Sequence, residues 1–438
     1  MTETSKQMPK HQAALNVSRK RAIVLVILAG LVATIMLALP SRGRQIADPI
    51  STSYAVTDPQ FLRAVNALVG PALVPGNRIT PLQNGDEAFG AMLAAIDGAQ
   101  RSITFESAYF RKGQMTRRFA NALAARARAG VKVHVNLDWA GAEKMGREDL
   151  AIMRDAGAEV EIYHKPHLQT PRRNYTRSHR RILVIDGRVA FTGGLCVADM
   201  WMGNAQDKDH WRDTQFRIEG PVVAQMQAAF MDNWRETHQT VMHDERYFPE
   251  LAAAGTQPAQ VVTSSPDENS ENVRLIYMLS IAAARHSIIV QNPYFVPDDV
   301  MRDELIAARR RGVTVEVMLP GPVMDAHMTA NASHSRLGPL LEAGVKIYEY
   351  QPTMLHMKIM VVDGIWVTAG SANFDNRSFR LNDEVNVNVF DTGLAVTLTE
   401  VFRRDQAHTR EYTLADWQHR PLRERIMQRI AANFRAQL

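Results

Sequence analysis

Two segments of the sequence repeat one arrangement of side chains that could do nucleophilic and acid–base chemistry. Each has a histidine, a cation two residues later, an aspartate at seven, small residues at fourteen and fifteen, and a further position at seventeen. The first segment supplies His179, Arg181, Asp186, Gly193, Gly194 and Cys196, and the second supplies His356, Lys358, Asp363, Gly370, Ser371 and Asn373. A single histidine motif is weak evidence of catalysis, but two with identical spacing argue strongly against a purely structural role.

These residue types fit transfer of a phosphodiester. That group is anionic and resists attack, so a catalyst needs cations on the phosphate, a nucleophile on one side and an acid on the other. One imidazole can form a phosphohistidine, while the other protonates the leaving alkoxide and deprotonates the incoming alcohol or water. The scheme requires no metal and no cofactor. We expect Asp186 and Asp363 to orient the imidazoles, and the small residues to let backbone amides or a hydroxyl approach the phosphate.

The elements around the motifs also occur twice. Each histidine leads into a β-branched run, where alternation puts the histidine and the cation on one face of a strand. In each half a helix precedes a buried strand, and a helix with a glycine stop precedes another strand. These segments are residues 94–110 and 127–133 in the first half and 281–295 and 309–315 in the second. The repeat predicts an α/β fold with helices covering a sheet in each half.

The chain of 438 residues, 46% apolar, is long enough for two domains. Residues 250–272 are rich in small, polar and turn-forming residues, so we expect domains over 47–264 and 265–438 that share an active site. The second ends in an amphipathic helix after Pro421. Its apolar positions are Leu422, Ile426, Ile430, Phe434 and Leu438, opposite Arg423, Arg425, Arg429 and Arg435. This helix could pack its apolar face on the domain or contact an anionic lipid surface.

Residues 1–46 are predicted to form a cytoplasmic tail and a membrane anchor. Residues 22–39 are an uncharged run of 18 residues, just long enough to span a bilayer and without a clean signal-peptide cleavage site. More basic residues precede the run than follow it closely, which predicts a single-pass anchor in the cell membrane with the catalytic region on the exported side. The one cysteine, Cys196, excludes an internal disulfide and leaves the compartment open.

The distribution of charge argues against a nucleic-acid partner. The formal charge is +5, but the first 44 residues hold seven basic side chains and one acidic one, which leaves 44 basic and 45 acidic side chains elsewhere. A nucleic-acid-binding domain normally has a strong basic excess. His164 and His167 are close in sequence, but no cysteine or carboxylate at ligand spacing accompanies them, so we expect no metal site. Protein partners cannot be inferred.

The paired motifs resemble the HKD motifs of the phospholipase D superfamily, and the resemblance runs from about Gly76 onward. Within the superfamily the chain is similar to bacterial cardiolipin synthases, in residues 211–213, 217–220, 294–298, 348–350, 355–358, 370–375 and 377–384. The resemblance implies two phospholipase D-like domains with a shared site. It also implies that a phosphatidyl group passes through a histidine to a second phosphatidylglycerol, which gives cardiolipin and glycerol.

The resemblance further implies particular roles. His179 would be the nucleophile and His356 the general acid and base. Asp213 and Glu384 would hydrogen-bond the histidine of the opposite or adjacent half-site. The first motif departs from the family pattern, with Arg181 for lysine and Cys196 for asparagine. Arginine keeps the charge on a bulkier planar head, and the cysteine removes an amide partner.

Four functions remain open. They are a cardiolipin-forming phosphatidyltransferase, a lipid hydrolase or other headgroup exchanger, a nuclease using the same histidines, and an inactive membrane scaffold. The near-neutral catalytic region and the apolar run disfavour the nuclease, and the intact second motif disfavours the scaffold. The choice between transfer and hydrolysis depends on whether the site excludes water, which spacing cannot show. The expected partners are therefore an anionic phospholipid, phosphatidylglycerol, and the membrane.

Overall fold

The computed structural model describes residues 24–26, 28, 46–165, 176–268 and 270–433. The described residues from Ile46 onward lie in one compact unit that holds both halves of the chain. Within the described residues, no helix combines the length and apolar character needed to cross a bilayer. Most of the predicted span lies outside them; its described members, Val24, Leu25, Val26 and Leu28, are helical with exposed side chains.

The described elements repeat in the order that the sequence predicts. After α2 (Pro59–Leu68), the first repeat contains β1 (Val74–Gln83), α3 (Asn84–Gly98), β2 (Ser102–Ser107), α4 (Gln114–Arg128), β3 (Lys132–Asp138), α5 (Trp139–Ala142), α6 (Arg147–Asp155), β4 (Glu159–Tyr163), β5 (Arg177–Ser178), β6 (Arg181–Ile185), β7 (Val189–Gly193), η1 (Asp199–Trp201), β8 (Thr214–Glu219) and α7 (Val223–His238).

The second repeat contains β9 (Gln257–Ser264), α8 (Asn272–Ala283), β10 (Ser287–Gln291), α9 (Asp299–Arg310), β11 (Thr314–Pro320), α10 (His327–Glu342), β12 (Lys346–Tyr350), β13 (Ile359–Val362), β14 (Trp366–Gly370), α11 (Asn376–Arg380), β15 (Asn382–Phe390) and α12 (Thr392–Gln406). It is followed by β16 (Thr409–Tyr412), α13 (Leu414–Gln418) and α14 (Leu422–Asn433).

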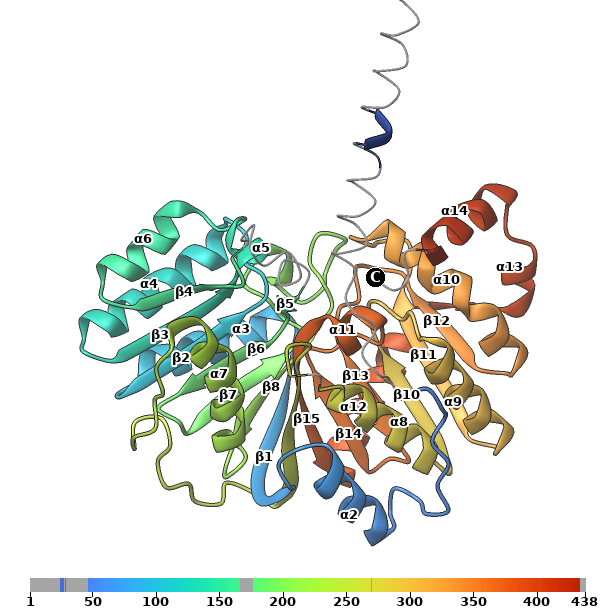
Figure 1. Ribbon diagram of the computed structural model, residues 1–438, viewed down its shortest axis with the longest axis horizontal. Helices are drawn as coiled ribbons and strands as arrows, with labels where there is room; N and C mark the ends of the chain where they lie inside the picture. Colours follow the sequence, from blue (N-terminus) through green and yellow to red (C-terminus); the bar gives the residue numbers. More distant parts are fainter. Residues whose placement is uncertain (1–23, 27, 29–45, 166–175, 269, 434–438) are drawn as a thin grey trace, which may run out of the picture. The chain divides into compact units, whose positions relative to one another are not determined.

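The described strands form one mixed sheet, ordered β16-β12-β11-β10-β13-β14-β15-β9-β1-β8-β7-β6-β2-β3-β4, with β5 beside β15. The order is mirrored about the antiparallel contact of β9 with β1, and in Figure 1 the two repeats spread to either side of this centre. The predicted α/β class with two similar repeats is confirmed. In the second repeat β9, which ends at Ser264, occupies the place of β1, and a domain boundary at residue 265 stays a prediction.

Successive side chains along a strand point to opposite faces of the sheet, so they pack in different cores. In β6, Leu183 packs in the core beneath α3 and α4, whereas Ile182 and Val184 face the other side. On that second face the repeats share a single core, to which α7 contributes Phe230 and α12 contributes Phe402. Burying one such side chain stabilises the fold by about 1.5–3 kcal/mol. The shared core therefore holds the two repeats, and the motifs they carry, in a fixed relation.

The C-terminal helix α14 packs against α10. Two of its residues are buried there: Ala431, which clusters with Val296 and Ala332, and Gln428. Leu422 and Ile426, by contrast, are 70% and 50% exposed. Of the two possibilities that the sequence leaves open for this helix, packing of the apolar face on the domain is wrong for Leu422 and Ile426, because the turn that holds Gln428 and Ala431 faces the body instead.

Candidate active site

Each motif histidine is hydrogen-bonded to a carboxylate from the other repeat. His179 lies just ahead of β6, and its Nδ1 is 2.8 Å from Oε1 of Glu384 on β15. His356 lies ahead of β13, and its Nδ1 is 2.8 Å from Oδ2 of Asp213, next to β8. Both carboxylates are fully buried. The resemblance left open which half-site each acid would serve, and the structure places each acid against the histidine of the opposite repeat.

The main chain makes a matching connection at both histidines. The amide of His179 donates to the carbonyl of Asp383 at 2.9 Å, and the amide of His356 donates to the carbonyl of Arg212 at 2.7 Å. In each case the acceptor directly precedes the carboxylate that binds the imidazole. Backbone and ring are thus both held by the same segment of the other repeat, which fixes the ring orientation.

The two cations lie beside the Nε2 atoms. Nη2 of Arg181 is 3.0 Å from Nε2 of His179, and Nζ of Lys358 is 3.3 Å from Nε2 of His356. Histidine and cation therefore share a face, as strand alternation predicts. Nη1 of Arg181 also lies 3.4 Å from the carbonyl oxygen of Ser371 in the second repeat. The Nε2 atoms and both cations accordingly lie where the repeats meet.

Asp186 and Asp363 lie away from the imidazoles. Asp186 accepts hydrogen bonds from the amides of residues 100–102, and Asp363 from those of residues 285–287. Both have positive φ, 53° and 50°, in the turns after β6 and β13. Seven residues of strand span about 23 Å, which carries the aspartate to the far end. The expected role of these aspartates at the histidines is therefore wrong; they cap the starts of β2 and β10.

The predicted phosphate contacts are also wrong for the amides of three of the small residues. The amides of Gly194, Gly370 and Ser371 donate to main-chain carbonyls at 3.3, 3.3 and 2.9 Å. A Cβ on Gly194 would come within 2.1 Å of Oδ1 of Asp213, and one on Gly193 within 2.6 Å of a strand carbonyl. Instead of meeting phosphate, the glycines let β7 and β14 approach the strands that carry the acids.

Two further members of the second motif remain near the acids. The hydroxyl of Ser371 donates to Oε2 of Glu384, which helps to orient that carboxylate. Asn373 is buried, and its Oδ1 has no hydrogen-bond partner among the described groups. Because an unpaired buried amide oxygen is costly, a ligand hydroxyl is a suitable donor to it. Substrate binding by Asn373 stays a prediction.

Aromatic side chains that sequence reasoning did not assign to the site surround His356. The rings of Trp201, Trp211 and Tyr294 have centroids 5.2, 5.3 and 6.2 Å from the imidazole. Nε1 of Trp201 also donates to Oδ2 of Asp213 at 2.9 Å. Trp211 and Tyr294 fall in segments that carry the resemblance, but Trp201 has no such signal. These rings help to bury the imidazole, whose side chain is 5% exposed.

Burial and charge set the protonation of the site. Burial, assisted by Arg181, lowers the pKa of His179 to about 4, and burial, assisted by Lys358, lowers that of His356 to about 3. Burial would raise the pKa of Asp213, but its hydrogen bond to His356 holds that pKa below the ordinary value. Neutral imidazoles beside carboxylates keep their proton on Nδ1, so each Nε2 carries a lone pair.

Burial and neighbouring charges also set the pKa values of Lys358 and Glu384. Burial, assisted by the charge of Arg181, lowers the pKa of Lys358 to about 7. Burial would raise the pKa of Glu384, but the charge of His179 and the hydrogen bond to it hold that pKa below its ordinary value. The site therefore offers two ionised carboxylates, two unprotonated Nε2 atoms and one permanent cation.

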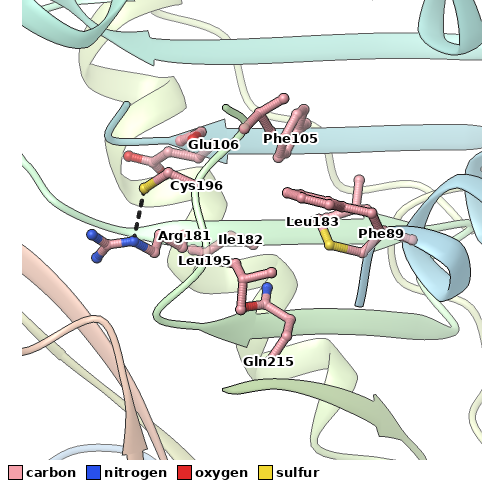
Figure 2. Close-up of a pocket in the computed structure, with 12 residues that line it drawn as sticks. Phe89, Phe105, Glu106, Arg181, Ile182, Leu183, Leu195, Cys196 and Gln215 are labelled. Atoms are coloured by element: carbon pink, nitrogen blue, oxygen red, sulfur yellow. Dashed lines mark hydrogen bonds between the residues drawn. The ribbon is translucent and has the colours of Figure 1, made fainter. Parts of the chain in front are cut away.

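Arg181 is one of the residues that line a pocket in the first repeat (Figure 2). Nε of Arg181 donates to Sγ of Cys196 at 3.1 Å, and the guanidinium points away from the apolar lining formed by Phe89, Phe105 and Leu183. The cysteine is buried and free. Arginine and cysteine, the two departures from the family pattern, are thus direct partners.

Among the described residues, one group of side chains could hold a metal ion. Ligand atoms of His164, Glu236 and Asp267 lie within 4.8 Å of one another, and Nε2 of His164 is 3.0 Å from Oε1 of Glu236. Sequence spacing missed this group because the two carboxylates are distant in the chain. An imidazole hydrogen-bonded to carboxylates gives the same distances, and the histidine chemistry of the site does not use this group.

Comparisons with known proteins agree with this geometry. A family model described as the phospholipase D-like domain of cardiolipin synthase matches residues 92–234 and 277–406. The chain is 32% identical to the major cardiolipin synthase ClsA of Bacillus subtilis strain 168, over 81% of this chain and 74% of that protein. It is 33% identical to a cardiolipin synthase of Staphylococcus aureus strain Mu50, over 80% of this chain and 71% of that protein.

A solved structure supports the fold. The chain resembles the phosphatidylserine synthase of Haemophilus influenzae Rd KW20, with a TM-score of 0.66 and 13% identity over 86% of this chain and 96% of that one. The family match includes both histidines and both carboxylates that bind them. From these matches and the paired site, we conclude that the chain belongs to the cardiolipin synthase family of phospholipase D-like proteins.

Proposed function

We propose that the chain is a phosphatidyltransferase that makes cardiolipin and glycerol from two molecules of phosphatidylglycerol. The observation that carries this proposal is the crossed pairing of His179 with Glu384 and of His356 with Asp213, each at 2.8 Å. This pairing places two imidazoles, each bonded to a carboxylate, where the two repeats meet. A two-step transfer needs both imidazoles at one site. The names of the relatives suggest the lipid.

In the first step, Nε2 of His179 attacks phosphorus and the bond from phosphorus to the glycerol oxygen breaks. His356 gives its Nε2 proton to the departing alkoxide, and glycerol leaves. The low pKa of His356 in the free site is raised when the anionic phosphate binds, because a nearby negative charge favours the imidazolium. Asp213 stabilises that cation through Nδ1. The product is a phosphatidyl group on the nitrogen of His179.

In the second step the proton moves back. His356, now neutral, removes the proton from a hydroxyl of the second phosphatidylglycerol, whose oxygen attacks phosphorus. The bond from phosphorus to Nε2 of His179 breaks, and cardiolipin forms. Arg181 and Lys358 hold the phosphate oxygens in both steps, and Glu384 balances the charge on His179. The side chain of His179 is 19% exposed and that of His356 5%, which supports His179 as the nucleophile.

The test is incubation of the membrane-embedded full chain with phosphatidylglycerol, with cardiolipin, glycerol and phosphatidic acid measured separately. Transfer gives cardiolipin and glycerol in equal amounts. Formation of phosphatidic acid without cardiolipin would show a hydrolase instead of a transferase, because water would then be the acceptor. Lipid binding without any product would favour the inactive scaffold. Full turnover by a His356→Ala variant would overturn the mechanism.

We further propose that residues 22–39 anchor the chain in the cell membrane, with the catalytic region on the exported side. Their length, their lack of charge and the basic residues ahead of them support this. The test is a pair of compartment-specific reporters fused after Leu438. Activity of the exported-side reporter agrees with the proposal, and activity of the cytoplasmic reporter alone reverses the topology.

A further inference from the structure

Two apolar side chains of the C-terminal helix α14, Leu422 and Ile426, are 70% and 50% exposed. Gln428 and Ala431 are buried against the body, at 5% and 2% exposure. At 3.6 residues per turn, Ile426 lies about 160° around the helix from Gln428 and about 140° from Ala431. Leu422 lies one turn before Ile426 on the same outward face. A helix that met only water and its own domain would be expected to have the opposite arrangement.

The outward face is rimmed by positive charge. Arg423, Arg425 and Arg429 are all exposed, against the single acid Glu424 on this helix. Met427, also on α14, is 43% exposed. Apolar residues at the centre and arginines around them suit the boundary between headgroups and acyl chains of an anionic bilayer, where the arginines meet phosphate. The same charges would not favour a second, identical copy of this surface.

The helix also lies close to a loop beside His356. Ala431 contacts Val296 and Ala332. Val296 is two residues from Tyr294, whose ring is 6.2 Å from that of His356. On α10, one turn before Ala332, Met328 is 48% exposed. A surface seated on these residues therefore adjoins the loop that borders the catalytic histidine.

We propose that Leu422, Ile426 and Met427 of α14, with the surrounding arginines, dock on an anionic lipid surface and hold the loop beside the active site against it. The inference rests on the proposed function only for the identity of the lipid substrate. Docking at this point would let a lipid headgroup enter the active site between the repeats while its acyl chains stay in the bilayer.

The test uses the full chain with one introduced cysteine. The native Cys196 is 2% exposed, so a polarity-sensitive fluorophore can be directed to Ile426→Cys. The matched control is Val396→Cys on α12, where the native side chain is 52% exposed. In phosphatidylglycerol vesicles, we expect the label at 426 to shift to shorter wavelength and to be quenched by acyl-chain nitroxide lipids, while the label at 396 does neither.

Two further measurements sharpen the result. Quenching at 426 should weaken in high salt, in phosphatidylcholine vesicles and in an Arg423→Gln, Arg425→Gln, Arg429→Gln variant. Equal quenching at 426 and 396 would overturn the proposal. A spectral shift without quenching would also overturn it, because the helix would then be covered by protein, such as a second copy.

Activity separates this proposal from the proposed function. A Leu422→Ser, Ile426→Ser, Met427→Ser variant should lose about tenfold in turnover on vesicles, and keep its turnover on short-chain phosphatidylglycerol in detergent. Normal cardiolipin synthesis with an unquenched label would reject the docking surface alone. A quenched label without cardiolipin would reject the proposed function and leave the surface.

Discussion

Oε1 of Glu384 lies 2.8 Å from Nδ1 of His179, although 205 positions separate the two residues in the chain. The reciprocal contact joins His356 to Asp213. Neither repeat therefore contains a complete histidine–carboxylate pair by itself, since each supplies the histidine of one pair and the acid of the other. Because each histidine takes its carboxylate from the other repeat, the two repeats form one site instead of two.

Removing the charge of a crossed carboxylate should abolish most of the turnover. In Asp213→Asn, an amide replaces the carboxylate that holds the proton on Nδ1 of His356 and stabilises its cation. We expect kcat to fall by about 10²–10⁴-fold, the range for loss of acid–base assistance. Cardiolipin formation by the purified variant measures this, and a loss below about threefold would contradict the assignment.

The same substitution at Asp186 is the matched control. Its carboxylate accepts the amides of residues 100–102 instead of contacting histidine. Asp186→Asn should lower the free energy of unfolding by about 1–2 kcal/mol and leave kcat per folded molecule unchanged. Thermal unfolding and turnover together test this. A stable but inactive variant would restore Asp186 to the catalytic site.

Deprotonation of Lys358 should make kcat/KM fall at high pH, which is the basic limb of the pH profile. Its pKa is lowered to about 7, so the free enzyme loses this cation as pH rises through that value, and kcat/KM for an anionic lipid falls. Arginine stays charged throughout this range, so Lys358→Arg should flatten the limb between about pH 7 and 9. Measurement of kcat/KM from pH 6 to 9 decides it; an unchanged limb would assign the titration to another group.

Arg181 and Cys196 should behave as one unit because Nε of the arginine donates to the thiol. We expect Arg181→Lys to keep or raise turnover, and Cys196→Asn to lower it, since the larger amide crowds the guanidinium. The double variant should recover, with a coupling energy of about 0.5–3 kcal/mol. Additive effects would argue against the pairing, and a collapse of Arg181→Lys would show a site tuned to arginine.

Glu106 should make stability depend on pH. It is 1% exposed, its Oε2 lacks a hydrogen-bond partner among the described groups, and burial raises its pKa to about 7. Between pH 4.5 and 7 the folded state holds more protons than the unfolded state, so this group's contribution to stability is lost as pH rises. Glu106→Gln should therefore stabilise the protein by about 1–3 kcal/mol at pH 8 and little at pH 4.5.

Denaturant unfolding at the two pH values checks this prediction. The second repeat offers a precedent, because Gln291 occupies the equivalent strand position opposite Ile359, as Glu106 lies opposite Ile182. An equal effect of Glu106→Gln at both pH values would show that the carboxyl does not change its charge on folding in this range.

The repeat itself was readable from the sequence. Two motifs with one spacing, each followed by β-branched residues, predicted the strands that became β6 and β13 and the shared face of histidine and cation. The strand rise would also have revealed that Asp186 lies at the far end of β6 from His179. That correction needed only the geometry of a strand.

Other features depend on contacts that spacing does not encode. The crossed partners need the two repeats to lie side by side in one sheet, and the antiparallel contact of β9 with β1 joins them. Gly194 is needed because the carboxylate of Asp213 occupies the space of its missing Cβ, a fact invisible before the strands are paired. Trp201 reaches His356 from a short helical turn without any periodic pattern.

The most direct test of the account is to locate the covalent intermediate. The membrane-embedded full chain is incubated with phosphatidylglycerol, quenched in alkaline denaturant to preserve the phosphorus–nitrogen bond, digested and analysed by mass spectrometry. We predict a phosphatidyl adduct, or the glycerophosphoryl adduct that remains after alkali cleaves its acyl esters, on the peptide that contains His179, and neither on the peptide with His356. Cardiolipin formation with the adduct on His356, or with no adduct on either histidine, would contradict it.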